Sequence, residues 1–273
     1  MVRMIGIVYS TADLVSENIA KGLVASHAFE EIREGVLACE ENKDLLVYRI
    51  DSPLLSAEFL DSVGLQVLYV LSRHKSEAGV GAMTVHATGN WGPEARLGGK
   101  PKQLSQAAPV EMLSALMKLG RINVRVEKTY EATHHGPLLK TPSFFIELGG
   151  EEEMLKSKEL ASKMAEAVFD SASEVINKQA AFSKVVFGVG GTHYPRKFSE
   201  LAIEKGYAFS HIMAKYAVKN PAGSYNTDMF EQAVSRSSKP PECAVVEWKS
   251  LNVELRNCVT KKLEEVGLDY EKV

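Results

Sequence analysis

Residues 65–77, LQVLYVLSRHKSE, carry the strongest indication of how this chain folds. The segment 65–71 is an almost continuous apolar run, which is typical of a strand buried on both faces of a parallel sheet. The segment 72–77 is polar throughout. In open α/β sheets, ligands bind beyond the carboxyl ends of the strands. We therefore expect a central strand that leads directly into a functional loop.

Strand and helix patterns alternate along the rest of the chain. Short apolar runs predict strands at residues 4–9, 45–50, 65–71, 83–88, 124–132, 143–148, 185–189 and 243–248. Amphipathic segments predict a helix that Ser10 or Thr11 caps and that runs to about residue 24, and further helices at 57–63, 110–119, 151–177, 195–205 and 253–266. This order predicts an α/β fold with a mostly parallel, mixed sheet and helices on both faces.

Glycine and proline mark several boundaries. Gly120 is predicted to cap the helix 110–119, whereas Pro195 and Gly206 are predicted to open and close the helix 195–205. We expect an irregular stretch at 89–109 and an excursion from the core at 220–241, which holds three prolines. Because no strong linker divides the chain, we expect one α/β domain over residues 1–273.

The composition is that of a globular protein. The 273 residues are 45% apolar and 25% charged with a formal net charge of −3, which excludes disorder for most of the chain. The longest apolar run is far shorter than the about 18 residues of a membrane-spanning helix, and the segment 4–8 is too short for a signal peptide. Three widely spaced cysteines without a CxxC motif predict reduced thiols. We therefore expect a cytoplasmic protein.

The first polar cluster follows the predicted strand 65–71. It contains His74, Lys75 and Glu77, which offer an imidazole, an ammonium group and a carboxylate within four residues. A loop that follows a buried central strand is a preferred position for a functional site. The alternative is a solvated loop that caps a helix.

The second cluster is THHGP, residues 133–137. Consecutive side chains on a strand point to opposite faces, so His134 and His135 converge on one ligand only if the backbone turns there. Gly136 and Pro137 supply that turn. Neutral imidazoles suit zinc. The alternative is that one member of the pair is a packed, hydrogen-bonded histidine.

The third cluster is GVGGTHYPRK, residues 188–197, where a predicted strand meets a predicted helix. Glycines allow close approach of a ligand, and a helix amino terminus offers free N–H groups to an anion. The pattern is neither a P-loop nor GxGxxG, so a nucleotide cofactor is not supported. The alternative is a glycine turn before a capped helix. The candidate residues are Gly190, Gly191, Thr192, His193 and Arg196.

Three further polar residues stand within apolar runs. Glu147 lies in the predicted strand 143–148, and a buried carboxylate there needs a partner, for which the histidines are the natural candidates. The alternative is an exposed strand end. His86 and His211 are single histidines among apolar residues, a setting that favours a satisfied core histidine.

The irregular stretch 89–109 combines an aromatic residue with basic ones. Trp91 lies near Arg96, Lys100 and Lys102. Aromatic rings stack on unpaired bases and cationic side chains hold phosphates, which is the combination expected for a single-stranded RNA end. The alternative is a tryptophan that plugs the core beside solvated lysines.

Three of these motifs together resemble the archaeal and plant type of D-aminoacyl-tRNA deacylase: SRHKSE at 72–77, THHGP at 133–137 and GGTHYPRKF at 190–198. Ala78 stands where a small polar residue is expected, which is a mild difference. The resemblance implies hydrolysis of the ester between a D-amino acid and the 3′ end of tRNA, with broad tolerance of the side chain. It also implies zinc dependence, a phosphorylase/hydrolase-like fold similar to peptidyl-tRNA hydrolase, and a cytoplasmic monomer with neither DNA nor a membrane as partner.

The chemistry of these residues is compatible with this family, because hydrolysis of an ester needs only a positioned water, a base and a charge that stabilises the oxyanion. We hypothesise that water is activated either by zinc or by a base. His134, His135 and His193 would bind the zinc, with Glu147 as a further ligand, or one of these residues would be the base. His74 and Glu77 would serve proton transfer or orientation, and Lys75 or Arg196 would hold the oxyanion or a phosphate. The predicted substrate-binding residues are Gly190, Gly191, Thr192, Arg196, Trp91 and Lys100.

Two other functions stay open at this point. A zinc peptidase or amidohydrolase would share the histidine and carboxylate chemistry, would bind a free peptide terminus, and would give Arg96, Lys100 and Lys102 no role. A noncatalytic protein that binds the tRNA end would bind without turnover, and would leave the three polar clusters unexplained.

Overall fold

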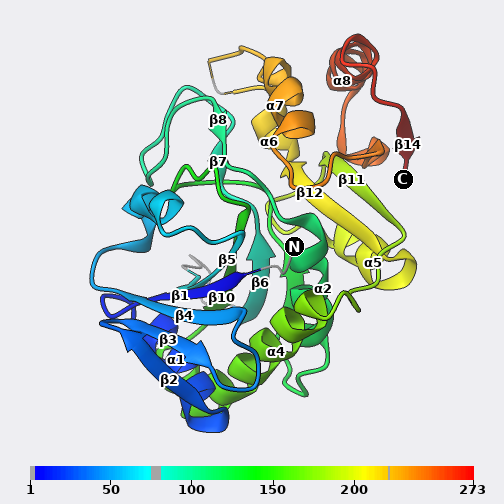
Figure 1. Ribbon diagram of the computed structural model, residues 1–273. Helices are drawn as coiled ribbons and strands as arrows, with labels where there is room; N and C mark the ends of the chain where they lie inside the picture. The colour runs from blue at the N-terminus through cyan, green and yellow to red at the C-terminus, as the bar shows by residue number, and fades with distance from the viewer. Residues whose placement is uncertain (1–3, 75–80, 221) are drawn as a thin grey trace.

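The computed structural model describes residues 4–74, 81–220 and 222–273 and shows a mixed α/β protein (Figure 1). The larger sheet has the strand order β2-β3-β4-β1-β5-β10-β6-β9, and the smaller has the order β12-β11-β13-β14. A short hairpin of β7 (Gly89–Asn90) and β8 (Gln103–Leu104) lies in the stretch that was expected to be irregular. The predicted α/β class with a mostly parallel sheet is confirmed.

The predicted central strand is β5 (Val67–Arg73). It pairs in parallel with β1 (Ile5–Ser10) and with β10 (Ser143–Gly149), and its residues are buried up to Ser72. β6 runs antiparallel to β10 and parallel to β9, so the large sheet is mixed. Its other strands are β2 (Phe29–Arg33), β3 (Val36–Cys39), β4 (Leu45–Ile50), β6 (Ala82–His86) and β9 (Glu127–Tyr130).

Side chains of the large sheet alternate between its two faces, each of which is covered by helices. Tyr69 and Ile146 pack against three long helices on one face, whereas Val70 and Phe145 face two short 3-10 helices on the other. Glu147 stands two residues after Phe145 and therefore shares its side of the sheet. The long helices are α1 (Leu14–Ser26), α2 (Pro109–Gly120) and α4 (Lys158–Ile176). The short helices are η1 (Leu54–Ser56) and η2 (Glu58–Ser62).

The smaller sheet is parallel throughout and lies against the larger one through helix α2, which packs on β12. Phe209 and Val245 share a core with Tyr69 of the large sheet. Its strands are β11 (Lys184–Val189), β12 (Tyr207–Met213), β13 (Cys243–Val246) and β14 (Tyr270–Lys272). Its helices are α5 (Arg196–Lys205), α6 (Lys215–Val218), η3 (Thr227–Met229), α7 (Phe230–Ser235), η4 (Trp248–Ser250) and α8 (Val253–Glu265). A single domain over residues 1–273 stays a prediction.

Asp13, rather than Ser10 or Thr11, caps helix α1. Its Oδ1 accepts hydrogen bonds from the backbone N–H groups of Val15 at 2.9 Å and Ser16 at 3.1 Å. The hydroxyl of Ser10 instead donates to a backbone carbonyl in the loop after β4. The first turn of α1 therefore lies beside the end of β5, because the other oxygen of Asp13 binds that strand.

Two other helix ends differ from the prediction. The expected helix 151–177 divides at Ser157, which ends α3 (Glu152–Lys156) and whose side chain caps α4. Gly120 belongs to α2, which Arg121 caps, whereas Gly206 with φ 67° caps α5 as predicted.

Among the described residues, no helix combines the length and the apolar content that crossing a membrane requires.

Candidate active site

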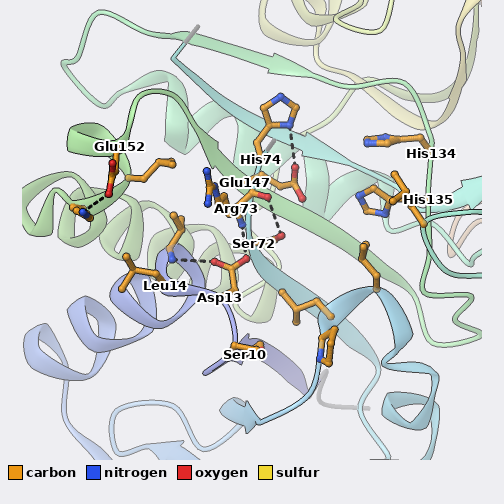
Figure 2. A pocket seen from close by; sticks show the side chains of 18 of the residues that line it. Ser10, Asp13, Leu14, Ser72, Arg73, His74, His134, His135, Glu147 and Glu152 are labelled. Atoms are coloured by element: carbon orange, nitrogen blue, oxygen red, sulfur yellow. Dashed lines mark hydrogen bonds and ion pairs between the residues drawn. The ribbon is translucent and has the colours of Figure 1, made fainter. Parts of the chain in front are cut away.

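A pocket of about 990 Å³ opens beyond the carboxyl end of β5 (Figure 2). Its walls include the first turn of α1, the segment 53–55 and helix α3, and most of its polar residues lie at the ends of strands or in the loops that follow them. Five of the predicted site residues meet here, in agreement with the position expected for ligands in α/β sheets. They are His74, His134, His135, Glu147 and His193.

Strand register explains why residues so far apart in the chain meet. Glu147 of β10 stands opposite Ser72 of β5 and opposite Thr84 of β6. His86 lies two residues after Thr84 and therefore faces the same side of the sheet as Glu147. The chain after β9 continues beside β6, since the backbone N–H of Glu131 donates to the carbonyl of Val85 at 3.0 Å.

His74 lies between two buried carboxylates. Its Nδ1 is 3.2 Å from Oε2 of Glu147 and 3.2 Å from Oε1 of Glu131, and its Nε2 is 2.5 Å from the hydroxyl of Tyr194. Burial disfavours a charge on this imidazole, but the carboxylates of Glu131 and Glu147 outweigh burial and raise the pKa of His74 to about 10. His74 is therefore a cation at neutral pH, held at the floor of the pocket.

Glu131 is the second centre of this network. Its Oε2 accepts from Nε2 of His193 at 2.8 Å and lies 3.8 Å from Nε2 of His134. Burial alone would raise the pKa of Glu131, but His193 and His74 lower it well below its usual range. The Glu131 carboxylate, which has no exposed side-chain surface, is therefore an anion shared by three imidazoles.

Three further imidazoles form a group beside these carboxylates. The Nδ1 atoms of His86, His134 and His135 donate to the backbone carbonyls of neighbouring residues at 3.1, 2.9 and 2.6 Å. These bonds fix the tautomer, so each ring keeps the lone pair at Nε2 when it is neutral. Burial disfavours a charge on His86, but the carboxylate of Glu147 outweighs burial and raises the pKa of His86. Burial, with the charge on His86 as a second cause, lowers the pKa of His135 to about 4 and that of His134 well below its usual range.

This histidine group has the chemistry of a zinc site. One ligating atom from each of His86, His134 and His135 lies within 4.8 Å of the others. Nε2 of His86 is buried and has no hydrogen-bond partner among the described atoms, because Oε1 of Glu147 is 3.8 Å away. Histidines that bind metals usually donate their other N–H to a carbonyl or carboxylate, as all three do here. The residues therefore fit a zinc ion.

The ligand set predicted from the sequence is not brought together as one group. His134 belongs both to the group with His86 and to a second group with Glu131 and His193, while Glu147 belongs to a third with His74 and Glu131. His86 was expected to be a satisfied core histidine. Its buried Nε2 without a partner contradicts that expectation.

The glycines of the third cluster serve a different purpose from the one predicted. Gly190 and Gly191 have φ of 107° and 74°, and a Cβ on Gly191 would lie 2.5 Å from Oε2 of Glu247. The N–H of Gly191 donates to the hydroxyl of Ser250 at 2.8 Å, and the Thr192 hydroxyl donates to a backbone carbonyl. The glycines make room for the turn 247–250, and in the described pocket lining neither they nor Thr192 take part.

Trp91, Lys100 and Arg196 also lie outside the described lining of the pocket. Trp91 is 5% exposed and its indole N–H donates to the carbonyl of Thr133 at 2.9 Å, so the prediction that it stacks on a base is wrong. Lys100 is exposed on the β7–β8 loop. The guanidinium of Arg196 forms two hydrogen bonds to the carboxylate of Glu127, at 2.9 and 3.2 Å, so it is not directed at the pocket.

Two predicted residues, Lys75 and Glu77, lie outside the described residues. The sequence interpretation missed Glu131 and the role of Tyr194. A signal for Glu131 was available, since it is a carboxylate at the end of the predicted strand 124–132 and stands three residues before His134. Tyr194 lies within the third cluster, where only its neighbour His193 was singled out.

The fold and the pocket define an α/β protein with an enzyme-like site, in which histidines and carboxylates meet at the pocket beside the end of β5. A model of the D-aminoacyl-tRNA deacylase family matches residues 62–271. The chain belongs to this family.

Relatives and a solved structure agree with that assignment. The D-aminoacyl-tRNA deacylase of Pyrococcus furiosus is 33% identical over 95% of this chain and 96% of its own length. That of Ignicoccus hospitalis is 42% identical over 73% of this chain and 78% of its own length. The crystal structure of a conserved protein of unknown function superimposes with a TM-score of 0.84 at 29% identity, covering 99% of this chain and 95% of that one.

Proposed function

We propose that this protein hydrolyses the ester between a D-amino acid and the 3′-terminal ribose of tRNA, releasing free tRNA and the D-amino acid. The observation that carries the proposal is the network in which the buried His74 and Glu131 join the partly exposed His193 beside an open pocket, in a chain of the D-aminoacyl-tRNA deacylase family. The pocket of about 990 Å³ supports tolerance of amino acids of different size. We further propose that the protein acts as a cytoplasmic monomer, without DNA or a membrane as partner.

His193 is the proton acceptor in this proposal. Its Nε2–H donates to Glu131 at 2.8 Å, which places the lone pair at Nδ1. Nδ1 lies 3.0 Å from the hydroxyl of Tyr216, which donates a hydrogen bond to this lone pair. The proton of the attacking water passes to His193 and Tyr216, and it is returned from them to the ribose oxygen when the ester C–O bond breaks.

His74 stabilises the negative charge that develops on the ester carbonyl oxygen. It is cationic, it lines the pocket, and two carboxylates and the hydroxyl of Tyr194 hold its ring in place. A charge that is fixed before the reaction begins costs no reorganisation in the transition state. Replacing His74 by Ala is expected to lower kcat more than it raises KM.

We propose that zinc is held by His86, His134 and His135. When bound, such an ion lowers the pKa of a coordinated water to about 7. The support for the ion is the orphaned Nε2 of His86 and the shared pattern of Nδ1 hydrogen bonds.

The test is release of labelled tyrosine from D-Tyr-tRNA and L-Tyr-tRNA in parallel, each with and without a chelator. Rapid loss of the D-ester alone supports the deacylase, and loss of that activity with chelator supports the zinc proposal. If neither ester is cleaved with zinc present, the proposed function is wrong and peptide substrates are the next assay.

A further inference from the structure

The pocket has two unlike ends. His134 and His135 stand at one end, close to the exposed side chain of Leu97. Glu152 stands at the other, on the opposite side of His74 (Figure 2). A substrate that places its ester at the histidines therefore extends in one of two chemically different directions.

The end near Glu152 is the cationic one. Arg73 and Lys156 are the only arginine and lysine among the described residues that line the pocket. Arg73 is the last residue of β5, and its backbone N–H donates to Oδ2 of Asp13 at 2.8 Å, which fixes it at the pocket wall. Lys156 is the last residue of α3 and is 59% exposed.

Both cations act on the same region of the pocket rim. The ammonium group of Lys156 is paired with the carboxylate of Glu152, one helical turn earlier. The pKa of Glu152 is lowered first by this pair and also by the charge of Arg73. An anion that enters at this end meets two solvated cations, the carboxylate of Glu152 that competes for them, and the carboxylate of Asp13, which is bound to backbone N–H groups.

We propose that Arg73 and Lys156 bind the phosphodiester backbone of the 3′-terminal nucleotides of the tRNA. This inference rests on the proposed function, because it takes the aminoacyl ester to lie at the histidines. Arginine matches phosphate with two parallel hydrogen bonds, and lysine acts as a point charge. The tRNA then leaves the pocket over α3, whereas the amino acid occupies the end lined by Leu97 and Leu55.

Glu152 weakens this phosphate subsite. Its carboxylate repels an incoming phosphate and holds the ammonium group of Lys156. The structure therefore assigns opposite effects to two neighbouring substitutions, Lys156→Ala and Glu152→Gln, which a loss of structure in α3 would not produce.

The experiment measures kcat and KM for D-Tyr-tRNA and for the D-tyrosyl ester of adenosine, which has the terminal nucleoside without any phosphate. Arg73→Ala and Lys156→Ala are each expected to raise KM for the tRNA about tenfold, and far less for the adenosine ester. Glu152→Gln is expected to lower KM for the tRNA. The slope of log KM against log salt concentration should fall by about 0.7 for each phosphate contact removed.

Lys163→Ala is the matched control. Lys163 pairs with Glu159 at the same spacing, and in the described pocket lining neither residue takes part. If Arg73→Ala and Lys156→Ala keep the KM and the salt slope of the Lys163→Ala variant while the parent cleaves D-Tyr-tRNA, the phosphate subsite is wrong. If the parent cleaves neither ester, the proposed function itself fails, and the subsite fails with it.

Discussion

His211 gives the protein an acid sensitivity whose size follows from its surroundings. The ring is fully buried on β12, its Nε2 donates to the carbonyl of Arg236 at 2.9 Å, and its Nδ1 lies 3.2 Å from the hydroxyl of Thr133. This neutral tautomer satisfies both nitrogens. Burial accordingly lowers the pKa of His211 to about 4, against an ordinary value of 6.5.

The sign follows from which state binds the proton first. As the pH falls below 6.5, the unfolded chain takes up a proton on His211, while the folded chain resists until about pH 4. A difference of about 2.5 in pKa is worth about 3 kcal/mol, which the folded state loses across this window. Above pH 6.5 His211 is neutral in both the folded and the unfolded chain, so its titration does not lower the free energy of unfolding.

His211→Gln removes the titrating group and keeps a donor for the carbonyl of Arg236. We expect the free energy of unfolding in urea, followed by circular dichroism, to be lower for the variant at pH 7 by about 1 kcal/mol, the worth of the lost hydrogen bond. Between pH 7 and 4.5 the parent should lose about 2 kcal/mol relative to the variant. Two curves that stay parallel to within about 0.5 kcal/mol over this range would refute the buried neutral imidazole.

The remaining predictions concern the site and its loops. His86→Ala should lower zinc affinity at least about tenfold by metal analysis after dialysis, whereas His27→Ala should retain the ion; equal zinc content in both would remove His86 from the ligand set. Glu131→Gln should cost about 3 kcal/mol in urea unfolding and at least about a hundredfold in kcat, because it leaves buried imidazoles without their anion; parental kcat in the folded variant would contradict its role. Gly191→Ala should lower the melting temperature more than Gly64→Ala, since both glycines have positive φ but only a Cβ on Gly191 meets a neighbour; equal shifts would show that φ alone matters.

Local patterns predicted the parts of the fold that local physics decides. The buried run before Ser72 became β5, and Gly206 became a left-handed cap. The edge hairpin β2–β3 and strand β12 were missed. The hairpin is largely exposed at β2 and so lacks an apolar run, and β12 carries Ser210 and His211 within its buried segment.

The candidate site could be predicted only where a local pattern marks a residue, as for Glu147, a carboxylate within an apolar run. His134 and His135 were found because they are adjacent and followed by a turn. His86 joins them only because β6 enters the sheet antiparallel to β10, a pairing that no local pattern specifies. Trp91 was assigned to RNA because basic residues stand near it in sequence, yet its indole packs in the core of the small sheet, beside Phe187. Long-range register, and not residue type, decided these positions.

The interactions that complete the site cross from one sheet to the other. His193 and Tyr194 follow β11 of the small sheet, whereas their partners Glu131 and His74 follow β9 and β5 of the large one. Synthesis must therefore pass β11 and Tyr194 before the candidate site can form. A polypeptide truncated before β11 would carry every histidine of the large sheet and still lack His193, the proposed proton acceptor. Turnover therefore requires that both the large and the small sheet have been synthesised and have packed against each other.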